Sequence, residues 1–229
     1  MGLNIDVFQE PRGVMRIIQF VFAIWAFAKT VDYTNEVHLT YCKENHSSLE
    51  FSYPYQLDRI QKSLHSCSNN SDPLTFSLVG DFSSDAQFFV ATGVMSMLYC
   101  VGISVVYVLF DEVYQSNATV PMTDFLATLL LAVFWLSGSA AWANGLVGLK
   151  AVTNPENILS WKICQELNCG AGIGSFSGLN ISITLGFLNF FLWAFDLWFL
   201  YKETQWFKDA NKTTPNSNLG VFIPDSQFK

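Results

Sequence analysis

The feature that most constrains this chain is a long segment without charge between Asp124 and Lys150. The 25 residues between these two side chains are uncharged. At about 1.5 Å per residue, a helix of that length crosses a hydrocarbon core of about 30 Å. We therefore predict a membrane-spanning helix over residues 122–149.

This segment also carries a line of small side chains at helical spacing. They are separated by four, four and three residues: Ser137, Ala141, Gly145 and Gly148. Small residues on one side of a membrane helix allow a second helix to approach closely. We predict that this line packs against a neighbouring helix. Trp135 and Trp142 lie on a different side, where we expect lipid or another helix.

Three further segments are apolar enough to span a membrane, at residues 14–31, 86–110 and 175–201. Hydrophobic residues make up 51% of the chain and charged residues only 14%, which is too apolar for an ordinary soluble domain. The first segment permits two interpretations. Its short uncharged centre, preceded by Arg16 and ending in Ala28, resembles a signal peptide. Alternatively it is an uncleaved helix whose Arg16 and Lys29 extend to the two interfaces.

The fourth predicted span has one small and polar side. Its members fall within roughly 80° of one another around a helix: Gly178, Ser182, Gly186, Asn189, Trp193 and Asp196. We expect this side to face the interior. Asp196 marks either an ion path, or a hydrogen bond between helices or a carboxylate that extends to the nearby interface. The second group of interpretations is favoured, because Asp196 lies about a turn and a half from Lys202 and no other acidic residue is expected at its depth.

The remaining segments are more polar and connect the spans. Residues 1–13 and 202–229 are the ends of the chain, the second without predicted structure, and residues 111–121 form a short turn. Residues 32–85 alternate in polarity in three runs and predict a small antiparallel sheet, with Pro54 placing the second run at an edge. Residues 150–174 form a second loop. The fold class is therefore all-α membrane, a four-helix bundle with a small sheet.

Cysteines orient the predicted bundle in the membrane. One pair, Cys42 and Cys67, lies in the 32–85 loop, and another, Cys164 and Cys169, lies in the 150–174 loop. Paired cysteines are useful in an oxidising lumen. The sequons at Asn45 and Asn69 also lie in the first loop and predict glycosylation there. With an uncleaved first helix, both loops are lumenal and both chain ends are cytosolic.

Several function classes are not indicated by the sequence. A net charge of −7 without a run of Lys or Arg argues against binding to nucleic acid. We find no catalytic triad, phosphate loop or metal-ligand spacing, and the three histidines read as surface residues of the first loop. We therefore expect no enzyme activity, no metal and no cofactor.

Long stretches of the chain resemble the synaptophysin family. The residues that carry the resemblance are FQEPRGVMRIIQFVFAIWAFA (8–28), LVGDFSSDAQFFV (78–90), PMTDFLATLLLAVFWLSGSAAWANGL (121–146), NPENI (154–158) and SGLNISITLGFLNFFLWAFDLWFLYKET (177–204). The resemblance runs from about residue 8 to residue 207 and includes all four spans. It implies a MARVEL-type four-helix protein of synaptic or related transport vesicles with an uncleaved first helix.

The resemblance has further implications. It implies one disulfide in each lumenal loop, which here corresponds to Cys42–Cys67 and Cys164–Cys169. It also implies self-association, cholesterol binding and association with the vesicle SNARE synaptobrevin. The tyrosine-rich tail of synaptophysin is absent, because residues 205–229 contain no tyrosine. A short-tailed member of the pantophysin type therefore fits best. The alternatives are a channel or transporter subunit and a cell-junction protein with four spans.

Overall fold

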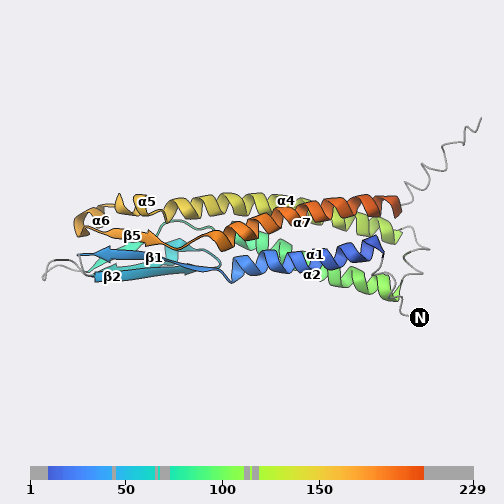
Figure 1. The fold of residues 1–229 in the computed structure, drawn as a ribbon, viewed down its shortest axis with the longest axis horizontal. Coiled ribbons are helices and arrows are strands. Elements are labelled where there is room, and N and C mark those ends of the chain that lie inside the picture. Colours follow the sequence, from blue (N-terminus) through green and yellow to red (C-terminus); the bar gives the residue numbers. More distant parts are fainter. Residues whose placement is uncertain are drawn as a thin grey trace, which may run out of the picture.

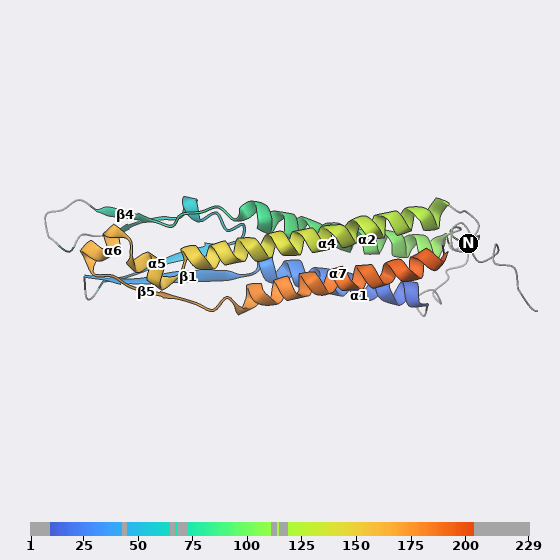
Figure 2. The same cartoon turned by 90° about the horizontal axis from the view of Figure 1, so that it is seen from above.

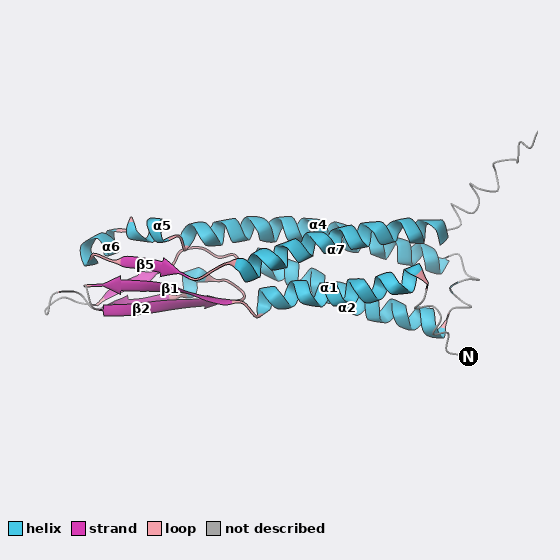
Figure 3. Ribbon diagram, viewed as in Figure 1, coloured by secondary structure: helices cyan, strands magenta, loops and turns pink. Residues whose placement is uncertain are grey.

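The protein is an elongated molecule with helices at one end and strands at the other (Figure 1). The computed structural model describes residues 10–42, 45–64, 67, 73–110, 114 and 119–203. Figure 3 shows the separation of the two kinds of secondary structure along the long axis. We call the two extremities the helical end and the sheet end.

Four helices are long and apolar enough to cross a membrane. They are α1 (Pro11–Val31), α2 (Ser83–Leu109), α4 (Thr119–Val152) and α7 (Ser177–Glu203). The main contacts join α1 to α2, α2 to α4, α4 to α7 and α7 to α1, so the helices form a closed ring. The described chain begins and ends at the helical end (Figure 1).

Helix α4 is longer than the span predicted at residues 122–149. Its 34 residues correspond to about 51 Å, well above a hydrocarbon thickness of about 30 Å. It starts at Thr119, three residues before the predicted span, so Asp124 lies in its second turn. In Figure 2, α4 runs from the helical end past the ends of the other long helices and continues alongside the strands as far as α5.

The small residues of α4 divide between two environments. Gly145 and Gly148 lie against the start of α2: a Cβ on Gly145 would meet Asp85 Oδ2 at 2.9 Å, and one on Gly148 would meet the Phe82 ring at 2.5 Å. Ser137 is exposed on the outside of the bundle, so the expectation that it packs against a helix does not hold. The reason is angular, because Ser137 lies about 140° around the helix from the buried Trp142.

The interior of α4 is instead occupied by its tryptophans. Trp135 and Trp142 are fully buried, and the Trp135 ring packs edge-on against Phe89 of α2 with 5.7 Å between centroids. The line of small residues runs along the border of this inward side. Ala141, at intermediate exposure, belongs to that border.

The polar side predicted for α7 lies toward the interior. Ser182, Gly186, Asn189 and Asp196 are buried, whereas Gly178 is partly exposed beside Tyr33. A Cβ on Gly186 would collide with Phe89 and with the hydroxyl of Ser139. Gly186 therefore permits a close approach of α7 to Phe89 of α2 and Ser139 of α4.

The sheet end contains two small antiparallel sheets. The first has the order β2-β1-β5, with β1 (Thr34–Tyr41) central between β2 (Asn45–Ser52) and β5 (Gly170–Ile173). The second pairs β3 (Gln61–Leu64) with β4 (Leu74–Ser77), and a short 3-10 turn, η2 (Leu57–Arg59), precedes β3. Strand β2 ends before Pro54, and β5, which the sequence did not predict, joins the second loop to the first.

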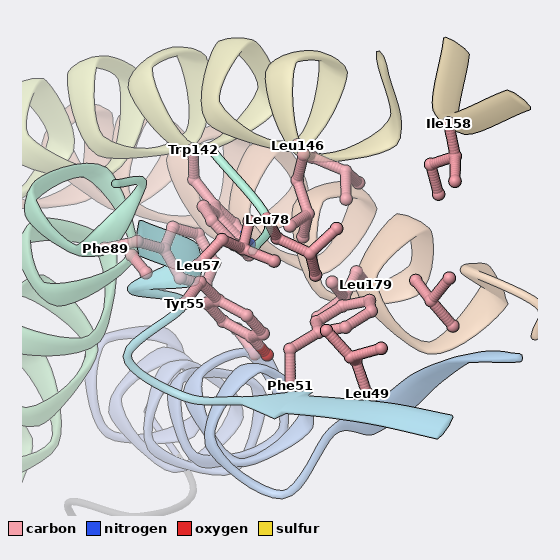
Figure 4. Packing of buried hydrophobic residues seen from close by; sticks show 14 of the residues in the cluster. Leu49, Phe51, Tyr55, Leu57, Leu78, Phe89, Trp142, Leu146, Ile158 and Leu179 are labelled. Atoms are coloured by element: carbon pink, nitrogen blue, oxygen red, sulfur yellow. The ribbon is translucent and has the colours of Figure 1, made fainter. Parts of the chain in front are cut away.

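Two short helices complete the second loop. They are α5 (Pro155–Leu159) and α6 (Lys162–Leu167). The Asn154 side chain caps α5 by accepting a hydrogen bond from the backbone N–H of Glu156 at 3.0 Å. Ile158 of α5 is buried among the residues that join the sheets to the helices (Figure 4).

Tyr55 fastens the sheet end to the bundle. Its ring stacks on Trp142 with 5.2 Å between centroids, and its hydroxyl donates a 2.6 Å hydrogen bond to the carbonyl of Thr30 at the end of α1. Phe51, Leu57 and Leu146 surround this contact (Figure 4). The sheets and helices therefore share one continuous apolar core.

The two environments of α4 lead to a prediction. Gly145→Leu should destabilise the bundle by about 1–3 kcal/mol or more, because Asp85 and the start of α2 cannot move away freely. Ser137→Leu should leave stability unchanged, since its side chain lies on the outer surface. Thermal unfolding of the purified variants in detergent provides the measurement. Equal melting temperatures for the two variants would contradict the assigned orientation of α4.

Candidate functional site

A cluster of charged and polar side chains lies inside the helical bundle near the helical end. All four spanning helices contribute to this polar cluster. Its members are Arg16 and Gln19 of α1, Tyr99 and Tyr107 of α2, Asp124 and Thr128 of α4, Asp196 of α7, and Tyr114. The side chains of Arg16, Asp124 and Asp196 are completely buried.

Helical spacing brings these residues together. Arg16 and Gln19 are three residues apart on α1, and Asp124 and Thr128 are four apart on α4, so each pair lies on one side of its helix. Arg16 and Asp124 each lie five residues from the start of their helices, and Asp196 lies seven before the end of α7. Because these three helix ends meet at the helical end, the three charges lie at one depth.

Arg16 is the centre of the polar cluster. Its Nη2 lies 2.8 Å from Asp124 Oδ1, and its Nη1 lies 2.8 Å from Asp196 Oδ2. It also donates hydrogen bonds of 2.9 Å to Gln19 Oε1 and to Thr128 Oγ1. One guanidinium thus joins α1, α4 and α7.

Aromatic rings enclose the same guanidinium. Its Cζ lies 5.4 Å from the ring centroid of Tyr99 and 5.4 Å from that of Trp193. Cation–π contacts of this kind strengthen when the cation is removed from water. Tyr99 extends the connection to α2.

Asp124 is surrounded by hydrogen-bond donors. The Tyr99 hydroxyl donates to Oδ1 at 2.5 Å, and the Tyr107 and Tyr114 hydroxyls donate to Oδ2, the latter at 3.2 Å. Charge-assisted hydrogen bonds are stronger than those between neutral groups. The donors replace the hydration that the carboxylate loses on burial, as a buried charge requires.

Two expectations from the sequence are wrong at this site. Arg16 does not extend to the interface but turns inward, because two carboxylates at its own depth offer stronger partners. Asp196 does share its depth with a second acidic residue, Asp124. The interpretation of Asp196 as part of a hydrogen-bonded contact between helices agrees with its bond from Gln19 Nε2 at 3.1 Å.

Further buried polar groups lie in the bundle beyond Arg16. Outside the polar cluster, five of the described residues each have a buried polar atom without a hydrogen-bond partner: Ser96, Trp135, Ser139, Asn189 and Trp193. One of the five, Trp193, contacts the guanidinium of Arg16 in the polar cluster. The polar side predicted for the fourth span had included Asn189 and Trp193, but not Ser96, Trp135 or Ser139.

The cysteines at the sheet end differ between the two loops. Cys42 and Cys67 form a disulfide, with Cα atoms 5.5 Å apart. Cys164 and Cys169 are free thiols in this structure, so the disulfide that the resemblance implies for this loop is not formed here; the N–H of Cys169 donates to the carbonyl of Cys164 at 3.0 Å. Burial, with a smaller contribution from the neighbouring Cys169, raises the pKa of the Cys164 thiol to about 12.

Of the two asparagines predicted to be glycosylated, one lies among the described residues. Asn45 is exposed at the first position of the edge strand β2. Asn69 lies outside the described residues. Among the residues that are described, no group of three or more His, Cys, Asp or Glu side chains is arranged to hold a metal ion.

The fold and the polar cluster define a class of protein. Four antiparallel apolar helices, fastened by charges that only a shielded interior tolerates, form an integral membrane bundle with four spans. Residues 8–199 match the family model of MARVEL, a membrane-associating domain. The match covers well over half of the chain, and the chain belongs to the MARVEL family.

Removal of the central cation provides a prediction for the polar cluster. Arg16→Met leaves Asp124 and Asp196 buried without a positive partner, which should cost about 3–5 kcal/mol. Lys29→Met, an exposed position on the same helix, should have little effect. Thermal unfolding and size-exclusion chromatography in detergent test this pair of variants. Similar behaviour of the two would show that the polar cluster does not hold the bundle together.

A second prediction concerns the two free cysteines. Cys164 and Cys169 are adjacent enough for their thiols to interact, so we expect them to form a disulfide under oxidising conditions. In the reduced protein the raised pKa of Cys164 should make its alkylation slow at pH 7, because the thiolate is the reactive form. Mass spectrometry of peptides from protein alkylated without reduction gives the result. Free Cys164 in protein isolated from an oxidising compartment would contradict the prediction.

Proposed function

We propose that this protein is a non-enzymatic organiser of transport-vesicle membranes, including those of synaptic vesicles. In this function it gathers a vesicle SNARE of the synaptobrevin type, cholesterol and further copies of itself during exocytosis and vesicle recycling. Membership of the MARVEL family supports a membrane role, and the resemblance of residues 8–28, 121–146 and 177–204 to synaptophysins supports the vesicle assignment. The proposed orientation has cytosolic chain ends and a lumenal sheet end.

One observation carries this proposal: the bundle keeps its charges inside and presents large apolar side chains outside. Arg16, Asp124 and Asp196 are buried against one another. On the outer side of α7, Phe191, Phe195 and Trp198 are 53%, 66% and 58% exposed. Membrane helices associate through van der Waals packing and hydrogen bonds, since lipid provides no hydrophobic drive between them. An outer surface of this kind suits a partner that is itself a membrane helix.

The proposal is tested by comparing variants on the outer surface of α7 with variants of the inward-facing residue Asp196. Phe195→Ala combined with Trp198→Ala should reduce recovery of synaptobrevin after crosslinking in intact vesicles, while bundle stability stays unchanged. Asp196→Asn, which keeps the shape and hydrogen-bonding capacity of an inward residue, should preserve folding, vesicle targeting and synaptobrevin recovery. Asp196→Leu should be defective in all three. Accumulation of the protein at cell contacts, or unchanged synaptobrevin recovery with the double variant, would overturn the proposal.

A second candidate function is a channel or transporter subunit. The observation in its favour is the buried charge of the polar cluster, continued by the unpartnered polar atoms of Ser96, Ser139 and Asn189 among the described residues. Purified protein in planar bilayers decides between the two candidates. Conductance that is present in the wild type and abolished by Asp196→Asn would establish the ion path.

A further inference from the structure

A groove on the outer surface of the bundle lies between α1 and α2. Its volume is about 410 Å³, and its apolar lining comes from both helices: Ile17 and Phe20 of α1, and Val101, Val105, Val108 and Leu109 of α2. Ile17, Val101, Val105 and Leu109 are between 42% and 50% exposed. In a protein that spans the membrane, this surface faces hydrocarbon, so lipid is the medium that enters the groove.

The polar lining of the groove contains a hydrogen-bond donor without a partner. Arg16 lines the groove, and its side chain is fully buried. Both terminal nitrogens of its guanidinium are bound within the polar cluster, but Nε has no hydrogen-bond partner among the described residues. A buried donor left unsatisfied costs about 1–3 kcal/mol. The groove therefore offers an apolar slot together with one N–H that lacks an acceptor.

The position of Arg16 along the helices indicates which acceptor fits. Helix α2 has 27 residues and a length of about 40 Å, so it extends about 5 Å beyond each side of a 30 Å hydrocarbon core. Ser104 of α2, like Arg16 of α1, lies five residues from the helical end of its helix, or about 7.5 Å along the axis. Ser104 thus lies about 2–3 Å below the boundary of the hydrocarbon core, and Arg16, which lines the same groove, lies in the same leaflet. That is the depth at which the ester carbonyls of a glycerophospholipid meet its acyl chains.

The extent of the groove matches a single leaflet. From Cys100 to Leu109, its lining on α2 covers nine residue steps, or about 13.5 Å, close to half of the hydrocarbon thickness. The charge of the polar cluster favours a neutral acceptor, since two carboxylates accompany one guanidinium. A carbonyl oxygen meets this requirement, whereas a phosphate brought to the same depth would meet the two carboxylates.

We propose that the groove between α1 and α2 binds one acyl chain of a glycerophospholipid, whose ester carbonyl accepts a hydrogen bond from Nε of Arg16. The chain lies against Ile17, Phe20 and Val101, deeper in the membrane than the carbonyl. The bound lipid satisfies the remaining donor of the residue that joins α1, α4 and α7. The lipid site is independent of the proposed vesicle partners.

Photolabelling with two matched lipids tests the site. The first probe is a phosphatidylcholine with a diazirine on one acyl chain, and the second is its ether-linked analogue, which lacks the ester carbonyl. In liposomes containing the full-length protein, the ester probe should label peptides of α1 and α2, and the ether probe should label them about fivefold less, as expected for the loss of one hydrogen bond. Equal labelling by the two probes would overturn the hydrogen bond to Arg16.

Variants distinguish labelling by a lipid bound in the groove from labelling by the surrounding bilayer. Val105→Trp fills the groove from its exposed side, so labelling of α1 and α2 should be lost while the melting temperature stays the same. Val133→Trp is the matched control, because Val133 of α4 is 52% exposed and does not line the groove. Arg16→Lys retains the charge but removes Nε, and should abolish the difference between the ester and ether probes. Undiminished labelling of Val105→Trp, or preferential labelling of the groove by a photoreactive sterol, would overturn the proposal.

Discussion

The ion pairs of Arg16 are the interaction on which the bundle depends most. Apolar helices in a membrane gain nothing from leaving lipid for one another, so packing and polar contacts must fix their arrangement. Here one guanidinium contacts carboxylates from two other helices, and the hydroxyl groups of Tyr99 and Tyr107 add the fourth helix. Charges inside a membrane protein are tolerated only with such partners. The polar cluster therefore specifies which side of each helix faces inward. The residues on the opposite sides form the outer surface.

Much of the fold was predictable from the sequence because membrane helices are marked by the absence of charge. The four long apolar segments correspond to α1, α2, α4 and α7, and the MARVEL match agrees with them. The polar side of α7 was also accessible, since one helical period relates Ser182, Gly186 and Asn189. These features depend on a single helix, which is why sequence alone reveals them.

The features that escaped prediction depend on contacts between segments. Arg16 seemed to belong to the interface because its helix was considered alone, although the alternating direction of the spans already placed it at the same end as Asp124 and Asp196. Strand β5 has the sequence Gly-Ala-Gly-Ile, which carries little strand preference, and it exists through its pairing with β1. The line of small residues on α4 was recognised, but its angular position relative to Trp142 required the neighbouring helices.

The two ends of the molecule are held together by different chemistry. At the helical end the polar cluster joins the helices. At the sheet end Tyr55 and Trp142 join the sheets to the helices, and the Cys42–Cys67 disulfide links the end of β1 to the loop between β3 and β4. Between the two ends, glycines such as Gly186 allow close contact but provide no directional bond. A reducing environment breaks the disulfide at the sheet end but leaves the polar cluster intact, so the sheet end can loosen while the helices remain assembled. Reduction of the Cys42–Cys67 bond therefore acts only on the side of the membrane that holds the sheet end.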